Sequence, residues 1–168
     1  MGTEIERKFL VDKDFVEDLI ENHKYDAIKH INQGYILNAS EKVVRVRIAD
    51  NEAYVTIKGK NEGALRPEFE YEIPISDAEY LIANMCQNII KKIRYIVYIS
   101  DDAWEIDLFQ GENSGLVVAE VEIPSIDYNL KIPPWVKEEV TDKTQYYNNN
   151  LSKHPYKSWV TGKEKHAK

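Results

Sequence analysis

Ionisable residues alternate with apolar residues along several segments of this chain. In an extended strand, residues i, i+2 and i+4 lie on one face, so the first segment places Glu4, Glu6 and Lys8 together. The same rule gathers further charges on the matching face of later segments, the bases being Arg45, Arg47, Lys58, Lys92 and Arg94 and the acids Glu68, Glu70, Glu72, Glu105, Asp107, Glu120 and Glu122. Six bases and nine acids are thus predicted to share one face of a sheet.

The two signs of charge separate by segment: the first segment carries both, and each later one carries only acids or only bases. Arginine and lysine side chains recognise phosphate, whereas clustered carboxylates repel a polyanion unless a hard divalent cation lies between them. Mg²⁺ and Mn²⁺ take oxygen ligands from carboxylates, phosphates and water. A solvated sheet face without function is the simpler interpretation for one strand. The whole set instead indicates a site for a metal and a triphosphate.

Eight alternating segments rich in Val, Ile and Tyr are predicted as strands, at residues 3–11, 27–37, 42–49, 53–58, 68–75, 88–99, 103–109 and 116–123. Helices are predicted at 13–22, with Asp12 as the cap, from Ser76, where Ser76 and Glu79 have the spacing of a capping box, and over 134–151. The predicted fold class is mainly β (α+β). We expect a closed eight-stranded antiparallel barrel with a charged lumen and a few covering helices.

The chain has 168 residues, which predicts one domain over 1–168 with a frayed tail at 162–168. One cysteine, no apolar run of the ~20 residues that a membrane span needs and a charged N-terminus favour a cytoplasmic protein without a membrane partner. A net charge of -7 argues against nucleic-acid binding. The expected partner is a small-molecule triphosphate. The apolar outer face of the barrel also motivates a weak homodimer hypothesis.

Charged motifs recur in a fixed order: Glu4-Ile5-Glu6-Arg7-Lys8, Gln33-Gly34-Tyr35, Arg45-Val46-Arg47, Thr56-Ile57-Lys58, Glu70-Tyr71-Glu72, Lys92-Ile93-Arg94, Glu105-Ile106-Asp107 and Glu120-Val121-Glu122. This ordered set, which covers nearly the whole chain, resembles the CYTH superfamily, the triphosphate tunnel metalloenzymes. Within this family, the chain resembles the compact bacterial members, and these look like inorganic triphosphatases. It implies a closed tunnel and metal-dependent hydrolysis of inorganic triphosphate to diphosphate and phosphate.

The resemblance also implies roles for individual residues. Phosphates would be held by Lys8, Arg45, Arg47, Lys58, Lys92 and Arg94, and Mg²⁺ or Mn²⁺ by Glu4, Glu6, Asp107, Glu120 and Glu122. Lys8 and Tyr35 stand at the catalytic positions, with Tyr35 in the place often assigned as proton acceptor. The residues that could position water are Glu68, Glu70, Glu72 and Glu105, with Glu120 and Glu122 as further candidates for the general base.

One departure from the family pattern lies near the C-terminus, where Lys143 stands in the place of an expected acid. The segment 140–151 is interpreted as a plug at one tunnel end. Thiamine triphosphate, nucleoside triphosphates, an RNA 5′ end, adenylate cyclisation and non-catalytic polyphosphate binding remain alternatives. The retained acids favour catalysis over simple binding. The sequence leaves open the substrate, the metal, the number of metals and the oligomeric state.

Overall fold

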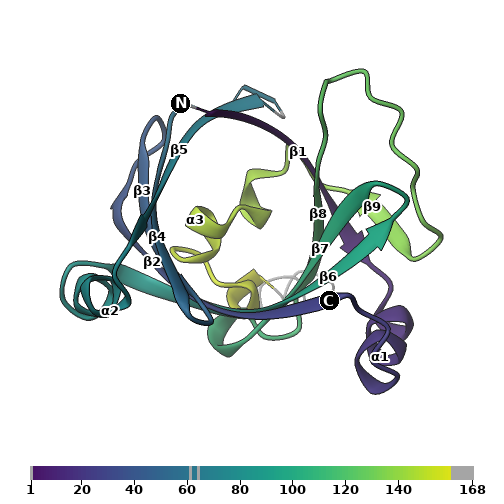
Figure 1. The fold of residues 1–168 in the computed structure, drawn as a ribbon, viewed down its shortest axis with the longest axis horizontal. Coiled ribbons are helices and arrows are strands. Elements are labelled where there is room, and N and C mark those ends of the chain that lie inside the picture. Colours follow the sequence, from purple (N-terminus) through teal and green to yellow (C-terminus); the bar gives the residue numbers. More distant parts are fainter. Residues whose placement is uncertain (1, 61, 64, 160–168) are drawn as a thin grey trace, which may run out of the picture.

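The computed structural model describes residues 2–60, 62–63 and 65–159, so the tail predicted at 162–168 lies outside the described residues. Nine strands form one sheet (Figure 1). Their bounds are β1 Gly2–Val11, β2 Ala27–Asn38, β3 Val43–Ala49, β4 Glu52–Lys58, β5 Leu65–Ile73, β6 Gln87–Ile99, β7 Asp102–Phe109, β8 Val117–Glu122 and β9 Val136–Glu139. The first eight correspond to the eight predicted strands.

The sheet closes into a barrel because β1 pairs at both of its edges. The order of strands is β5-β4-β3-β2-β6-β7-β8-β1-β9, and β1 also returns to β5, with Gly2 opposite Glu68 and Ile5 opposite Leu65. The ninth strand, which was not predicted, pairs with the other half of β1. All pairings are antiparallel. The prediction of a closed eight-stranded antiparallel barrel is confirmed, with one strand added.

Two helices cover apolar patches on the outside of the barrel. Helix α1 (Lys13–Glu21) packs Val16 and Leu19 into a cluster around Trp104, and α2 (Ile75–Asn84) packs Ala78 and Ile82 against Val46. The two helices lie at opposite sides of the ring of strands (Figure 1). Burying these faces supplies the apolar core that a charged lumen cannot provide. The homodimer hypothesis stays a prediction.

Of the two predicted helix caps, the one at Ser76 is wrong and the one at Asp12 is at the predicted position. Helix α2 begins at Ile75 with Pro74 as its N-cap residue, and neither α2 nor α1 receives a side-chain hydrogen bond at its cap. Proline fixes its own φ, here -59°, so the chain turns directly from β5 into α2 and Ser76 falls inside the helix. Asp12 does occupy the N-cap position of α1, but without a side-chain bond.

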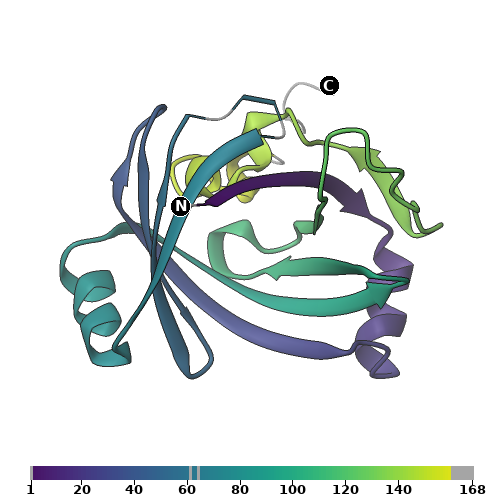
Figure 2. The same ribbon diagram turned by 45° about the horizontal axis from the view of Figure 1, so that its top comes forward.

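The predicted C-terminal helix over 134–151 is also wrong. This part of the chain forms β9, a 3₁₀ turn η2 (Thr144–Tyr146) and a short helix α3 (Asn148–Leu151). A second 3₁₀ turn, η1 (Gly111–Asn113), precedes β8. Figures 1 and 2 show α3 inside the ring of strands. No helix in the described part of the chain is long and apolar enough to cross a membrane.

The C-terminal segment fills one end of the lumen with apolar side chains. Val140, Tyr146 and Leu151 are buried there against side chains from the strand ends, namely Tyr35, Val43, Ile90, Phe109, Leu116 and Val118. Ile90 lies opposite Gln33, and Phe109 lies opposite Lys92, so these apolar residues share the lumen face with polar ones. The lumen therefore has a charged part and a packed apolar end. The packed end closes the barrel on that side.

Candidate active site

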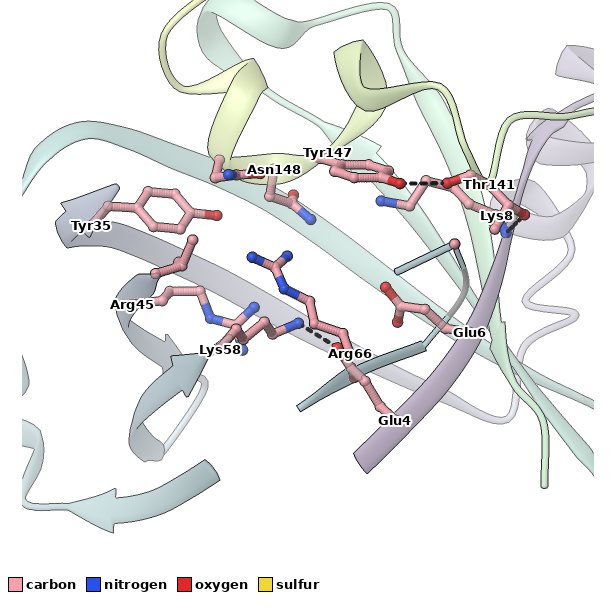
Figure 3. Close-up of a pocket in the computed structure, with 13 residues that line it drawn as sticks. Glu4, Glu6, Lys8, Tyr35, Arg45, Lys58, Arg66, Thr141, Tyr147 and Asn148 are labelled. Atoms are coloured by element: carbon pink, nitrogen blue, oxygen red, sulfur yellow. Dashed lines mark hydrogen bonds and ion pairs between the residues drawn. The ribbon is translucent and has the colours of Figure 1, made fainter. Parts of the chain in front are cut away.

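Six of the predicted site residues line one cavity inside the barrel. They are Glu4, Glu6, Lys8, Tyr35, Arg45 and Lys58 (Figure 3). The other lining residues are Val43, Gly63, Arg66, Thr141, Tyr147, Asn148 and Asn149. The remaining predicted bases and acids are absent from this lining. The structure thus brings both halves of the predicted site together, with carboxylates of β1 facing bases of β3 and β4.

Lys8 is a buried base at the centre of this arrangement. Its Nζ lies 3.2 Å from Oε1 of Glu120 on β8, and 5.0 Å from the centre of the Tyr147 ring. Burial acts to lower the pKa of Lys8, but Glu120 and Glu6 outweigh it and hold that pKa above its usual value. Its backbone N–H donates to Oγ1 of Thr141 at 3.0 Å. Lys8 is therefore a fixed, charged group that the C-terminal segment helps to position.

The two arginines of β3 are incompletely neutralised, although Arg45 lies 3.7 Å from Glu70, whereas Lys58 of β4 lies 2.7 Å from Glu4. Arg45 donates to Oγ1 of Thr56 at 3.2 Å, and its buried Nε has no hydrogen-bond acceptor among the described residues. Arg47 donates from Nε to Oε1 of Gln33 at 2.8 Å and has no ion-pair partner in the described part of the chain. Burial, with repulsion from Arg45 and Arg94, lowers the pKa of Arg47 to about 9. Such a cluster favours an anion beside it.

The bases of β6 form a buried network with Asp107 of β7. Arg94 donates to both carboxylate oxygens of Asp107, at 2.7 Å and 2.9 Å, and Lys92 Nζ lies 2.7 Å from Oδ2. Arg94 also contacts Glu105 at 3.0 Å. Burial raises the pKa of Asp107, but Arg94 and Lys92 outweigh it, so that pKa lies below its usual value. Asp107 is therefore engaged by two bases rather than directed at the cavity.

Glu6 differs from its neighbours because no hydrogen bond or ion pair reaches its carboxylate from the described residues. Burial, followed by repulsion from Glu120 and Glu4, raises the pKa of Glu6 to about 8. Glu4 instead lies 2.7 Å from Lys58 Nζ. Among the described residues, no three His, Cys, Asp or Glu side chains stand close enough together to hold a metal ion as they are. Glu6, Glu4 and Glu120 offer carboxylate oxygens, and a cation beside Glu6 would offset the repulsion among them.

The acids of β5 and the last acid of β8 are not among the residues that line the cavity. Glu68 lies 4.0 Å from Lys58, and burial, followed by its contact with Glu4, raises the pKa of Glu68 to about 7. Glu70 accepts from Thr56 at 2.9 Å. Glu72 and Glu122 are exposed. Of these acids, Glu68 has the charge state that is most easily changed near neutral pH.

Tyr35 is buried beside the bases. Its hydroxyl accepts from Nε2 of Gln33 at 3.3 Å. Burial raises the pKa of Tyr35 in spite of Arg45 and Arg47, so the phenol stays neutral at physiological pH. The adjacent Gly34 has no room for a side chain, because a Cβ there would lie 2.6 Å from Cβ of Cys86. This close approach explains the glycine before Tyr35.

Sequence reasoning missed the contribution of the C-terminal segment and of Arg66. Oδ1 of Asn148 accepts from Lys92 Nζ at 3.0 Å, and the hydroxyl of Tyr147 donates to the backbone oxygen of Thr141 at 2.7 Å. Lys143, the departure from the family pattern, points away to Glu138 at 3.0 Å. No strand periodicity marks these polar residues, because the segment that carries them is largely irregular.

Comparison with known proteins places this chain among relatives of similar length. The family model described as "CYTH domain" matches residues 2–156. An inorganic triphosphatase of Acetivibrio thermocellus is 41% identical over 95% of this chain and 99% of its own length. An inorganic triphosphatase of Nitrosomonas europaea is 32% identical over 89% of this chain and 97% of its own length.

Solved structures agree with these relatives. The crystal structure of an inorganic triphosphatase aligns with a TM-score of 0.61 and 31% identity over 90% of this chain and 95% of that chain. A putative adenylate cyclase from Bacillus halodurans, 17% identical with a TM-score of 0.58 over 74% of this chain and 83% of that chain, shares the fold. The charged lumen, the closed barrel and these matches lead to one conclusion: the chain belongs to the CYTH domain family.

Proposed function

We propose that this protein hydrolyses inorganic triphosphate to diphosphate and phosphate with Mg²⁺ or Mn²⁺. The observation that carries the proposal is that the two arginines of β3 are not fully neutralised, since Arg45 has only Glu70 beside it, at 3.7 Å. Arg47 has no ion-pair partner and Arg45 leaves its buried Nε unbonded within the described residues. A buried cation without a counter-ion is costly, so a polyanionic ligand fits this cluster. The relatives named inorganic triphosphatase support that choice of polyanion.

The six predicted bases would act in two groups. Lys8, Arg45 and Lys58 line the cavity and would contact the phosphate chain. Arg47 would stand behind them and add positive potential, since a charge in a low-dielectric interior acts over several ångströms, whereas Lys92 and Arg94 are paired with Asp107 and Glu105. In this arrangement Asp107 fixes Lys92 and Arg94 in place. The bases would neutralise the charge that develops on the leaving diphosphate.

A divalent cation fits the acids of β1 and β8 better than it fits Asp107. The carboxylate of Glu6 has no hydrogen-bond or ion-pair partner among the described residues. Burial, and then repulsion from Glu120 and Glu4, raises the pKa of Glu6. We assign Glu4, Glu6, Glu120 and Glu122 as the residues that would hold the ion, with water and phosphate oxygens completing its shell. Both oxygens of Asp107 are already taken by Arg94 and Lys92, whereas Glu4 and Glu120 each have one oxygen near a lysine, at 2.7 Å from Lys58 and 3.2 Å from Lys8. A bound ion would supply charge withdrawal from phosphate and a lower pKa for water.

The reaction then requires one proton acceptor. The oxygen of a water molecule attacks a terminal phosphorus, the bond from that phosphorus to the bridging oxygen breaks, and its electron pair stays on diphosphate. Glu68 is our assignment for the group that takes the proton, because it lies 4.0 Å from Lys58, which lines the cavity, and its pKa of about 7 suits a general base near neutral pH. Tyr35, whose pKa burial raises, is assigned as a neutral hydrogen-bond donor to phosphate rather than as the acceptor.

The experiment that tests the function is an assay of phosphate release from inorganic triphosphate, ATP and thiamine triphosphate, each with Mg²⁺, Mn²⁺ or EDTA. We expect fast release from inorganic triphosphate with either metal and none in EDTA. Preference for ATP or thiamine triphosphate would contradict the proposed substrate but not metal-dependent triphosphate hydrolysis in the tunnel. Tight binding of triphosphate without turnover would contradict catalysis and indicate a binding module.

A further inference from the structure

Arg66 lies on the lumen face of the barrel although the sequence analysis did not include it. It precedes Glu68 by two positions on β5, and side chains at that spacing share a face. Its Cα pairs with that of Glu4 on β1. Figure 3 shows the Arg66 guanidinium in the cavity beside Arg45 and Lys58. Arg66 is therefore a fourth base lining the cavity, supplied by the β4–β5 hairpin.

The guanidinium of Arg66 is anchored through one nitrogen only. Its Nε donates to the backbone oxygen of Gly59 at 2.8 Å. Its two terminal nitrogens have no acceptor among the described residues. The nearest acids on the same face are engaged elsewhere, since Glu4 lies 2.7 Å from Lys58 and Glu68 lies 4.0 Å from the same lysine. An arginine that merely balanced these acids would pair with one of them.

This geometry suits recognition of a phosphate group. A guanidinium is planar and presents parallel N–H groups that match two oxygens of one phosphate. The hydrogen bond from Nε to Gly59 holds the Arg66 side chain against the hairpin. The two terminal nitrogens of the guanidinium are left directed at the cavity. Because the side chain is held before a ligand arrives, less conformational entropy is lost on binding.

We propose that Arg66 binds the triphosphate directly and is a further substrate-binding residue of this site. The inference rests on the proposed function, because it takes inorganic triphosphate as the ligand. It adds a contact from the β4–β5 hairpin to those from β1, β3 and β4. The phosphate chain is then enclosed by bases on the hairpin side and by Lys8 on the side of the C-terminal segment.

The test is titration of inorganic triphosphate into the metal-free protein in EDTA, followed by measurement of kcat and KM with Mg²⁺. Loss of a charged, bidentate contact predicts about tenfold weaker binding or more for Arg66→Ala. Arg66→Lys keeps the charge without the planar fork, and we expect it to restore part of the affinity. Lys60→Ala is the matched control, since Lys60 lies in the same hairpin, is exposed and does not line the cavity.

For Arg66→Ala, we expect both Kd and KM for triphosphate to rise. The thermal midpoints of all variants should stay close to that of the wild type. Equal loss in Lys60→Ala and Arg66→Ala would overturn the proposal and indicate a general charge effect, and unchanged affinity in Arg66→Ala would overturn it outright. A wild-type protein that binds triphosphate without hydrolysing it refutes the proposed function alone, and the Kd comparison still decides the role of Arg66. A wild type that binds no triphosphate, with or without Mg²⁺, refutes both.

Discussion

Burial governs the charge states of the residues in this lumen. Glu6 has a pKa raised to about 8 because it is buried near Glu120 and Glu4. Lys92 has a pKa lowered to about 7, first by burial and then by Arg94, in spite of its contact with Asp107. These groups are held close to like charges without a ligand. A cation bound by the acids and a polyanion bound by the bases would each reduce this repulsion. Binding of one ligand should therefore increase the affinity for the other.

Glu6→Gln tests the acid assigned to the cation. The amide keeps the size of the side chain and removes its charge, so we expect metal-dependent turnover to fall at least about 100-fold, as losses at metal-supporting residues do. Phosphate release measured against Mg²⁺ concentration checks this. Circular dichroism should be unchanged, because Glu6 makes no hydrogen bond or ion pair in the described structure that would be lost. Full activity in this variant would refute the metal assignment.

The raised pKa of Glu6 predicts a pH dependence of the metal-free protein. Between its ordinary value of 4.5 and about 8, the folded state holds more protons on Glu6 than the unfolded state does. This contribution to stability is therefore present at low pH and is lost as the pH rises through about 8. Mg²⁺ must displace the same proton, so its affinity should rise with pH up to about 8. Denaturant titrations and calorimetry across pH 6–9, with Glu6→Gln as the control, measure both trends. A pH-independent affinity would contradict the shift.

Glu68→Gln tests the proton acceptor. The expected result is a fall in kcat of about 10²-fold or more, since general bases contribute that much, with little change in the Kd for triphosphate. Glu72→Gln is the matched control, because Glu72 lies four residues further along the same face of β5 and is exposed. Stopped-time phosphate assays and binding titrations separate the two quantities. Equal effects in both variants would argue against a specific role.

At the scale of elements, the C-terminal segment is the least regular part and yet completes the site. It closes one end of the barrel with Val140, Tyr146 and Leu151. It also places Asn148 on Lys92 and Thr141 on the backbone of Lys8. Packing of the apolar residues therefore sets the positions of the polar ones. Stability and catalysis are coupled through this segment.

Leu151→Ala tests that coupling. Leu151 is fully buried in the lumen, and removal of such a side chain typically costs about 2–5 kcal/mol. We expect a loss of this size in urea unfolding and a lower kcat, because the segment that supports Lys8 and Lys92 loosens. Ile126→Ala is the control, since Ile126 is 74% exposed. A stable variant with unchanged turnover would show that the segment has no part in positioning the site.

At the scale of the whole molecule, a chain with a net charge of -7 encloses a cluster of bases. The acids needed for a cation and the bases needed for a polyanion lie on different strands, and closure of β1 onto β5 brings them together. The cavity is lined by residues from five strands, β1 to β5, and by the C-terminal segment, so a ligand bound there would contact all of them. Binding should therefore stabilise the entire barrel rather than one element.

Thermal unfolding with added ligand tests this statement. At 100 times the Kd, a ligand that binds only the folded state adds about 2.7 kcal/mol of stability. We expect inorganic triphosphate in EDTA to raise the unfolding midpoint, and orthophosphate at equal ionic strength to raise it less. Differential scanning calorimetry measures both. Equal shifts from the two anions would indicate a general salt effect and contradict a triphosphate site.

The sequence by itself determined the eight strands, their lumen faces and most of the charged residues. This was possible because alternation in a strand is a local rule: Glu4, Glu6 and Lys8 share a face whatever surrounds them. Arg66 obeys the same rule and was missed because the predicted strand began at residue 68, whereas β5 begins at Leu65. Element boundaries are set by pairing with a neighbour, here β1, which one segment of sequence does not specify.

Only the tertiary structure decided which charges meet and in what conformation the C-terminal segment closes the barrel. Periodicity grouped Asp107 with the acids, but folding across β6 and β7 placed it between Arg94 and Lys92. The segment predicted as a C-terminal helix instead forms β9 and the residues that fill the lumen end. Burial of Val140 and Leu151 inside the ring of strands outweighs the local helix preference. Charge partners and plug contacts join residues distant in sequence, so their identity depends on the closed barrel.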